Sequence, residues 1–344
     1  MNKSTFIVSE DNIRNTNYIA KGLILMYHRV TRLESDPRSL AVAPENFTEQ
    51  IRLIKRDFTP VKLTEMVEMN ESENLSRPLI ALTFDDGYRD NYLNACRILN
   101  EYQMPATFFL VSKYLGSKHG YWGDLLGELL LEPGKLPPFN KINIDLGIEE
   151  ELWNSAGSLN DDDYYRNLDW VWQDSDPTPR HTLYRKLYAW MRMQPEKRRN
   201  KVMTVLCAAF GTPTVACEKN QFMSKEEAAA IASDPLFDIG THTMTHQDLT
   251  TLSRNRQKRE ISNSKKSLEL ITGEPSTSFS YTYGRYMQQT INLVKKSGFM
   301  CACTVEEGVV HPDTDPFLLP RIHIKDWNGE TFEKKISRFF EFRK

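Results

Sequence analysis

The sequence predicts an α/β fold, in which a parallel β-sheet is covered by helices on both faces. Two apolar runs, Gly22–Tyr27 and Leu79–Phe84, are typical of buried strands because they do not alternate between apolar and polar residues. A reactive side chain follows each run: His28 comes after the first, and Asp85 and Asp86 come after the second. A helix and another strand are predicted after these aspartates, and strand–helix–strand is the unit from which parallel sheets are built.

Apolar periodicity predicts the helices between and after these two runs. In the segment Pro44–Phe58, the side chains of Phe47, Ile51 and Ile54 recur at helical spacing. Gly87, directly after the aspartates, permits a turn that a Cβ would disfavour. The other predicted elements in this part of the chain are a helix at Leu63–Met69, a helix at Asp90–Tyr102 and a strand at Ala106–Val111.

The alternation of strands and helices stops between about His119 and Phe222. This segment combines prolines, an acidic run and two apparent helices, at Arg180–Met193 and Glu196–Phe210. We therefore predict that residues 1–118 and 223–344 form one barrel domain. Residues 119–222 are predicted to be a mostly helical insertion that packs near the rim where the strands end.

Five of the six tryptophans lie in this insertion. Such rings either fill a small helical core or offer a surface on which sugar rings stack, and the first role is the commoner one. Trp122 lies nearest in sequence to the rim of the barrel, so we predict that it lines a substrate groove.

Regular structure resumes after the insertion. Ser224 and Glu227 form a capping box that opens a short helix. The strand Phe237–Gly240 then ends in Thr-His-Thr-Met-Thr-His, which places His242 and His246 at the rim. The remaining predicted elements are a helix at Ser253–Ile271 stopped by Gly273, a strand at Phe279–Tyr283, a helix at Met287–Lys296, strands at Met300–Val305 and Arg321–Ile324, and a helix from Thr331.

Composition restricts the classes of partner. A net charge of -2 with 26% charged residues argues against a nucleic-acid-binding surface, which would carry a basic excess. The segment Met1 to Tyr18 lacks the apolar core of a signal peptide, and no later stretch has the ~18 apolar residues of a membrane span. We therefore expect a cytoplasmic protein with no membrane span, and its five scattered cysteines fit reduced thiols.

The residues at the rim suit a catalytic metal site. His242 and His246 are four apart and can lie on one helical turn, while a carboxylate from another strand supplies a third ligand. This set leaves an open position, as in catalytic zinc sites that activate a water molecule. Thr243 stands where the zincin motif has its glutamate base, so the base must come from elsewhere.

Two adjacent carboxylates can supply the third metal ligand and the general base. Of Asp85 and Asp86, one can bind the metal while the other accepts a proton from the water. His28 could then protonate a leaving group, although a histidine held by hydrogen bonds in a loop is an equally common reading. The residues alone do not say which aspartate has which role.

These segments resemble the polysaccharide deacetylases of carbohydrate esterase family 4, the NodB-homology group. The resemblance covers most of the chain outside residues 119–222. Four segments carry the resemblance. Leu25–Val30 is similar to the N-terminal segment of circularly permuted members of the family. The first, second and third motifs of the family are similar to Thr83–Gly87, Thr241–His246 and Phe279–Gly284, respectively.

The resemblance implies a distorted (β/α)7-type barrel and a specific role for each residue. Asp85 would be the catalytic base, and His28 would replace the C-terminal acid of other members. The implied ligands of a divalent metal ion are Asp86, His242 and His246, and the backbone amide of Tyr283 would help to hold the oxyanion. The ion would be zinc, with cobalt or nickel as alternatives, and the reaction would be removal of an N-acetyl group from an amino sugar in a polysaccharide, an oligosaccharide or a glycan precursor.

The chain departs from this family at two positions of the third motif. Many members have an arginine that holds the catalytic aspartate where this chain has Ser280, and Thr282 replaces a common proline. Another group must therefore orient Asp85. Arg321, at the start of a late predicted strand, is the candidate, although it could equally be a structural arginine.

Two other functions are compatible with the sequence. An O-acetyl esterase acting on a carbohydrate would use the same residues. Comparison of acetate release from N-acetylated and from O-acetylated glycans distinguishes this esterase from an N-deacetylase. A catalytically silent carbohydrate-binding barrel would bind sugar without metal and release no acetate. The complete set of acid, base and three ligands argues against the silent barrel.

Overall fold

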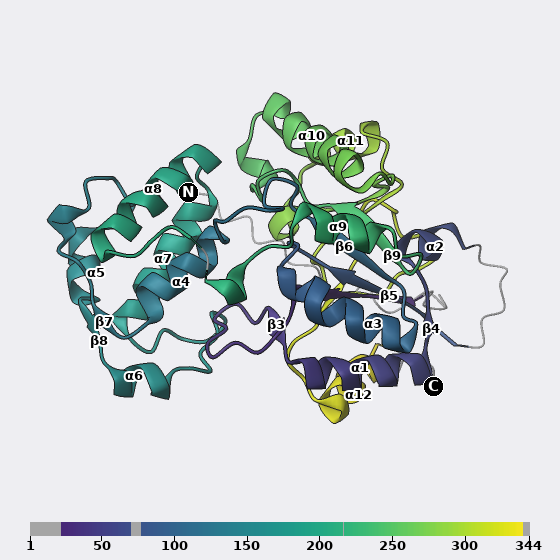
Figure 1. The fold of residues 1–344 in the computed structure, drawn as a ribbon, viewed down its shortest axis with the longest axis horizontal. Coiled ribbons are helices and arrows are strands. Elements are labelled where there is room, and N and C mark those ends of the chain that lie inside the picture. The colour runs from purple at the N-terminus through teal and green to yellow at the C-terminus, as the bar shows by residue number, and fades with distance from the viewer. Residues whose placement is uncertain (1–21, 70–76, 216, 340–344) are drawn as a thin grey trace, which may run out of the picture.

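A curled sheet of parallel strands forms the centre of the larger part of the molecule (Figure 1). The computed structural model describes residues 22–69, 77–215 and 217–339. Seven strands are hydrogen-bonded in the order β11-β10-β9-β6-β5-β1-β12, and each neighbouring pair is parallel. This half-barrel confirms the predicted α/β fold class.

The strands are short and begin near the predicted positions. Their bounds are β1 (Gly22–Tyr27), β5 (Leu79–Phe84), β6 (Ala106–Leu110), β9 (Phe237–Thr241), β10 (Ser278–Ser280), β11 (Cys301–Cys303) and β12 (Ile322–His323). A further strand, β4 (Thr59–Pro60), pairs with the start of β5, and β2 (Arg29–Val30) pairs with β3 (Ala41–Val42) beside the main sheet.

The register of β1 and β5 places the two sequence motifs side by side. Gly22 pairs with Leu79 and Tyr27 pairs with Phe84, so His28 and Asp85 both follow the carboxyl ends of adjacent strands. Gly22 is required at the start of β1 because a Cβ there would lie 2.5 Å from the carbonyl oxygen of Leu79. The carboxyl ends of the strands are where barrel enzymes place their reactive residues.

Helices cover both sides of this sheet. In Figure 1, α1, α3 and α12 lie below the sheet and α10 and α11 lie above it. The bounds are α1 (Pro44–Asp57), α2 (Leu63–Glu68), a π-helical turn (Asn91–Ala95) that continues into α3 (Cys96–Tyr102), α9 (Lys225–Ala232), α10 (Arg254–Thr272), α11 (Gln288–Lys296) and α12 (Gly329–Ser337). The predicted Ser224 capping box and the stop at Gly273 are both confirmed.

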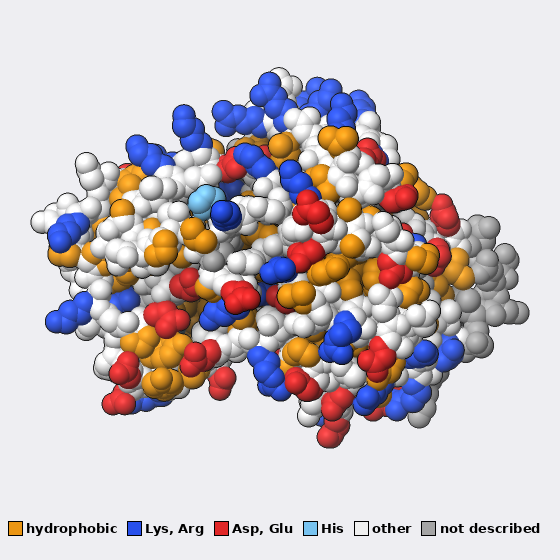
Figure 2. All heavy atoms as spheres, viewed as in Figure 1, with side chains coloured by type: hydrophobic (Ala, Val, Ile, Leu, Met, Phe, Trp, Pro, Cys, Tyr) orange, Lys and Arg blue, Asp and Glu red, His pale blue; other side chains and the backbone are white. Residues whose placement is uncertain are grey.

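A second group of helices lies beside the half-barrel, on the left of Figure 1. We call residues 122–210 the helical layer. Its elements are α4 (Trp122–Leu131), β7 (Gly134–Lys135), a 3₁₀ turn (Phe139–Lys141), α5 (Glu150–Ser155), β8 (Ser158–Leu159), α6 (Asp161–Arg166), α7 (Pro179–Arg192) and α8 (Glu196–Phe210). It has its own apolar core, which includes Leu126, Trp153, Leu183 and Leu206. Figure 2 shows the layer in contact with the half-barrel, with a notch at the lower edge where they meet.

A buried arginine holds the interior of the helical layer together. Arg180 is 2% exposed, and its guanidinium donates to the carbonyl oxygens of Ala156, Leu130 and Gly134 at 2.9, 3.0 and 2.9 Å. Its contacts join α7 to the ends of α4 and α5. A charged group so far from water is tolerated because several acceptors replace its hydration.

The predicted strand Phe279–Tyr283 is only half correct. β10 ends at Ser280, and a 3₁₀ turn, Thr282–Gly284, follows, in which Tyr283 has a left-handed φ of 56°. Threonine and tyrosine favour strands, but the hydroxyl of Thr282 donates to the carbonyl of Gln247 at 2.6 Å. A tertiary contact therefore overrides the local preference at this position.

Two expectations about location have different outcomes. Every described helix is too short or too polar to serve as a transmembrane span. The segment Met1 to Tyr18, on which the expected lack of a signal peptide rests, lies outside the described residues. The cytoplasmic location therefore stays a prediction.

Candidate active site

Three predicted metal ligands come together at the carboxyl ends of β5 and β9. Ligand atoms of Asp86, His242 and His246 all lie within 4.8 Å of one another, and all three residues are buried. The Nε2 atoms of His242 and His246 lie 3.6 and 3.1 Å from Asp86 Oδ1. The structure thus places two nitrogens and one oxygen around a single point.

The expectation that the two histidines share a helical turn is wrong. Residues 242–248 form a loop without helical structure. Thr243 and His246 have positive φ angles of 64° and 49°, and Asp86 has a φ of 76°. Left-handed backbone at residues other than glycine costs about 1–3 kcal/mol each and persists only where the surroundings enforce it. The loop therefore brings both rings to Asp86 at an energetic cost.

The hydrogen bonds of His242 determine which nitrogen is free. Its Nδ1 lies 2.9 Å from the carbonyl oxygen of Ser280, which can only accept, so Nδ1 carries the proton. Burial lowers the pKa of His242 to about 4, so the ring is neutral near pH 7 and Nε2 presents a lone pair toward Asp86. A ligand histidine held by a backbone carbonyl through its other nitrogen is the usual arrangement in metal sites.

Asp86 is ionised in this environment. Burial acts to raise the pKa of Asp86, but the adjacent imidazole of His246 and the other histidines outweigh it and hold the pKa below its usual range. Among the described residues, Asp86 Oδ1 has no hydrogen-bond partner although it is buried. An unsatisfied buried carboxylate oxygen is unfavourable. A divalent cation would satisfy it, so the donor set fits such an ion, and the two nitrogens with one oxygen suit zinc.

Loss of one ligand is expected to weaken metal binding while the fold remains. We expect His246→Ala to lower the affinity for zinc at least about tenfold, because only two ligands remain. Elemental analysis and competition with a chromogenic chelator measure the loss. His119→Ala changes an exposed histidine that contacts the carbonyl of Thr214 and is not one of the three ligands, so this control should retain full metal content. Unchanged zinc binding by His246→Ala would remove this residue from the ligand set.

Asp85 is held by a network of buried donors. The guanidinium of Arg321 donates to both its carboxylate oxygens, each at 2.8 Å, and the hydroxyl of Ser280 donates to Oδ2 at 3.2 Å. Arg321 is itself fixed by the carbonyl of Thr304 and the hydroxyl of Thr83. Burial acts to raise the pKa of Asp85, but Arg321 outweighs it and the pKa falls to about 2. The carboxylate that was predicted to act as base is thus ionised and fixed in orientation.

The structure places Arg321 where the sequence hypothesis needs it. Ser280, which the sequence marks only as a departure from the family, is part of the same network, because it also accepts from Arg321 Nη2 at 2.9 Å. Arg321, directly before β12, thus supplies the guanidinium that orients Asp85, and Ser280 completes the network.

His28 follows β1 at the same edge of the sheet. Its Nδ1 is buried and has no hydrogen-bond partner among the described residues. Burial lowers the pKa of His28 below the usual value of histidine, although Asp86 and Asp85 act to raise it. The ring of His323 lies 5.3 Å from that of His28, edge to face.

Sequence reasoning missed His323 as a neighbour of His28. Burial lowers the pKa of His323 to about 3. The register pairs it with Met26, which becomes apparent only when β12 is placed beside β1. Nothing in the linear sequence indicates that the last strand pairs with the first.

Tyr283 lies against the second histidine motif. Its ring packs edge to face on that of His246, with centroids 4.5 Å apart. Its hydroxyl contacts the hydroxyl of Tyr121 at 2.9 Å and the carbonyl of His246 at 3.4 Å. The predicted groove residue is thus next to the candidate metal centre.

The structure gives Trp122 a different role from the predicted one. Its side chain is 6% exposed, and its ring packs on those of Tyr188 and Tyr121 with centroids 4.6 and 5.1 Å apart. A ring enclosed in this way cannot stack on a sugar. The tryptophan fills the core of the helical layer, because it opens α4 on the side that faces α7 and α8.

Two residues, Arg199 in the helical layer and Tyr121 directly before it, reach the site without any signal in the sequence. Tyr121 packs edge to face on His246 with centroids 5.3 Å apart, and its hydroxyl also contacts that of Tyr188 at 3.0 Å. The guanidinium of Arg199 donates to the carbonyl oxygens of Thr245 and His246 at 2.8 and 3.2 Å. The helical layer therefore forms part of the wall of the site.

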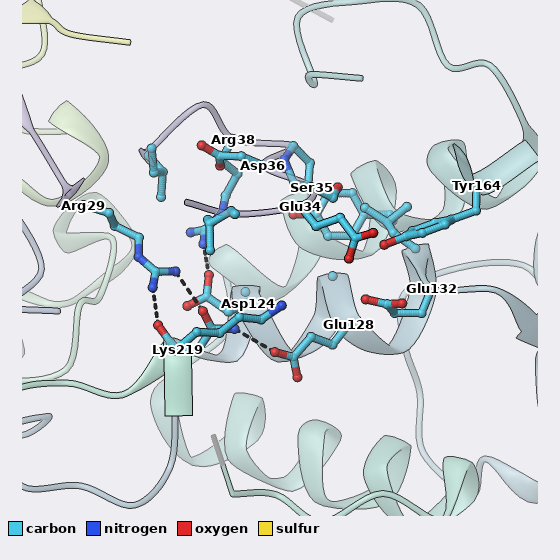
Figure 3. Close-up of a pocket in the computed structure, with 18 residues that line it drawn as sticks. Arg29, Glu34, Ser35, Asp36, Arg38, Asp124, Glu128, Glu132, Tyr164 and Lys219 are labelled. Carbon is cyan, nitrogen blue, oxygen red and sulfur yellow. Dashed lines mark hydrogen bonds and ion pairs between the residues drawn. The ribbon is translucent and has the colours of Figure 1, made fainter. Parts of the chain in front are cut away.

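A polar pocket lies beside this wall, between the loop after β2 and helix α4 (Figure 3). Its open space is about 70 Å³, and the carboxylates of Glu34 and Glu132 lie on the side near Tyr164. Arg38 pairs with Asp124 in the pocket wall, and its guanidinium carbon also lies 4.9 Å from the centroid of the Tyr121 ring. The pocket and the candidate site thus share one wall.

A comparison with known families finds a match in two separate segments of this chain. A family model for polysaccharide deacetylase matches residues 72–133 and 201–302. These two segments contain Asp85, Asp86 and both histidines of the second motif. They leave out His28, Arg321 and residues 134–200, which form most of the helical layer.

Individual proteins are similar over nearly the whole chain. The poly-β-1,6-N-acetyl-D-glucosamine N-deacetylase of Staphylococcus epidermidis is 21% identical over 332 residues, covering 93% of this chain and 84% of that protein. IcaB from Ammonifex degensii has a similar structure, with a TM-score of 0.56 at 15% identity, over 94% of this chain and 97% of that one. BC0361, a polysaccharide deacetylase from Bacillus cereus, matches with a TM-score of 0.56 at 17% identity, over 92% of this chain and 69% of that one. The structural matches establish the fold.

Proposed function

Because this chain belongs to the polysaccharide deacetylase family, we propose that it is a metal-dependent enzyme that hydrolyses the N-acetyl group of an amino sugar. The substrate would be a polysaccharide, an oligosaccharide or a glycan precursor. The observation that carries the proposal is the position of Asp85, which Arg321 fixes beside a buried set of one aspartate and two histidines. A binding protein has no need of this arrangement.

The metal ion in this proposal is zinc, held by Asp86, His242 and His246. When bound, a zinc ion lowers the pKa of a water molecule and polarises a carbonyl group. The neutral imidazole of His242 and the ionised carboxylate of Asp86 are in the protonation states that ligands require. Cobalt and nickel suit the same donors and are the alternatives.

Asp85 acts as general base in this proposal. Its carboxylate removes a proton from the attacking water while the water oxygen forms a bond to the acetyl carbon. Two hydrogen bonds from Arg321 keep the carboxylate oriented throughout. The backbone amide of Tyr283 is the proposed donor to the oxyanion that develops at the acetyl oxygen.

His28 acts as general acid in the second half of the reaction. Its imidazolium gives a proton to the amide nitrogen as the bond from this nitrogen to the acetyl carbon breaks. The products are acetate and a free amine on the sugar. Protonation is needed because an unprotonated amide nitrogen is a very poor leaving group.

Release of acetate from matched substrates tests the proposal. The purified protein is treated with a chelator, reloaded with zinc, cobalt or nickel, and incubated with oligomers of β-1,6-linked N-acetylglucosamine. We expect acetate release with at least one of these ions and none after chelation. Faster release from O-acetylated glycans would favour the esterase alternative. Sugar binding without metal and without acetate release would favour the silent binding barrel.

A further inference from the structure

On the barrel side, one carboxylate accepts hydrogen bonds from two neighbouring N–H groups of the loop that carries His246. Oε2 of Glu260, on α10, accepts from the backbone N–H groups of Met244 and Thr245, each at 3.0 Å. Its Oε1 accepts from the hydroxyl of Thr245 at 2.9 Å. These bonds satisfy donors of Met244 and Thr245 only, so the carbonyl groups of the loop depend on other partners.

The carbonyl groups on both sides of His246 are held from the helical layer. Arg199, on α8, donates through Nη2 to the carbonyl of Thr245 and through Nη1 to that of His246. These two carbonyls belong to the peptide groups immediately before and after the His246 Cα. Arg199 is 1% exposed, and its guanidinium carbon lies 5.7 Å from the centroid of the buried Trp122 ring.

This contact matters because the backbone of His246 is in an unfavourable conformation. Its φ of 49° lies in the left-handed region, so the residue needs external restraints on its two peptide groups. The hydroxyl groups of Tyr114 and Tyr283 each donate to one of these two carbonyls, at 3.1 and 3.4 Å, whereas the Arg199 fork joins both through one rigid planar group. The ring of Tyr121, directly before the helical layer, packs on the imidazole itself, so Arg199 and Tyr121 together contact the backbone and the side chain of His246.

We propose that Arg199 is a positioning residue for the metal site, and that through it the helical layer fixes the ring of His246 against Asp86. This inference rests on the proposed function, because it gives His246 its role as a ligand. Arg199 itself touches neither the substrate nor the three ligand atoms. Its effect passes through the two peptide groups that it holds.

A purely structural arginine in the same layer provides the matched control. Arg180 is equally buried and also donates to backbone carbonyl groups, but all of its acceptors lie inside the helical layer. Substitution of either arginine removes a comparable set of buried hydrogen bonds. Only substitution of Arg199 releases the loop of the metal site.

The test compares R199K with R180K in the full chain. Lysine keeps the positive charge but cannot bridge both carbonyl groups with a rigid fork. We expect R199K to bind zinc roughly tenfold more weakly in calorimetric titration of the chelator-treated protein, as is typical when a group that orients a ligand is lost. The visible absorption spectrum of the cobalt-loaded R199K protein should also change. R180K should lower the melting temperature while its zinc affinity and cobalt spectrum remain those of the unmodified chain.

Two results would overturn the inference. If R199K has the zinc affinity and the cobalt spectrum of the unmodified chain, Arg199 is only a packing residue. The same conclusion follows if R180K loses as much zinc affinity as R199K. If R199K does not fold, R199Q, which has no buried charge, replaces it with the same expected loss. Metal binding by the unmodified chain without acetate release would refute the proposed function alone, whereas absence of metal binding would refute both.

Discussion

Asp85→Asn is expected to lower turnover by about 10²–10⁴-fold while the metal stays bound. Asparagine has nearly the same shape as aspartate but cannot accept the proton of the attacking water. The three ligand atoms belong to Asp86, His242 and His246, so the metal content should not change. Steady-state acetate release and elemental analysis on the same protein preparation measure the two quantities separately.

The same substitution also breaks a buried ion pair. Arg321 is fully buried, and without the charge of Asp85 its guanidinium keeps only neutral acceptors. Removal of one partner from a buried pair destabilises a protein by about 3–5 kcal/mol. Turnover therefore has to be expressed per folded molecule, with folding followed by circular dichroism.

Asp90→Asn is a control for this loss of stability. Asp90 is a buried aspartate that pairs with the buried Arg29, at 3.0 Å, so the substitution breaks an ion pair of the same kind. It changes neither the predicted base nor a predicted ligand. Equal losses of turnover in Asp85→Asn and Asp90→Asn would mean that the first effect is structural. Substantial turnover in Asp85→Asn at saturating metal would end the assignment of Asp85 as base.

The sheet and the central motifs could be predicted from the sequence because local patterns determine them. A run such as Leu79–Phe84, apolar at nearly every position, fits only a strand that is covered on both faces, and the structure has it fully buried. The residues that follow such strands meet at one edge of a parallel sheet. Asp86 and His242 could therefore be brought together without knowledge of the strand order.

The conformation of the histidine loop could not be predicted, because residue spacing does not specify backbone angles. His242 and His246 match the spacing of one helical turn, whereas the structure joins them by a loop with two left-handed residues. The partners that stabilise this loop are Glu260, 16 residues after Met244 on α10, and Arg199, 46 residues before Thr245 on α8. Such contacts depend on tertiary packing and leave no periodic signal.

The prediction for Trp122 was wrong for a different reason: its residue type suggested contact with a sugar, but its packing in the core excludes that role. A tryptophan near a rim is a reasonable candidate for stacking on a sugar, but this one is needed to fill the space between α4, α7 and α8. In this part of the chain, the ring of Tyr121, the residue before it, reaches the site. A shift of one position along the chain changes the direction of a side chain from the core to the site.

His28→Ala is expected to lower the rate of amide hydrolysis by about 10²–10⁴-fold with the metal retained, because the amine then leaves without a proton donor. The size of the loss should depend on the leaving group. An acetate ester of a nitrophenol has a leaving group that needs no proton, so its hydrolysis should be affected far less. The ratio of the two rates therefore isolates the acid step from any general damage to the site.

His323→Ala is the matched control for this experiment, because it removes the imidazole that packs on His28 and leaves His28 itself in place. If His28 is the acid, His28→Ala should change the ratio of amide to ester hydrolysis much more than His323→Ala. Equal changes in the two variants would mean that the pair of rings acts only by packing. Near-normal amide hydrolysis by His28→Ala would require another proton donor at this edge of the sheet, and His323 is then the nearest imidazole.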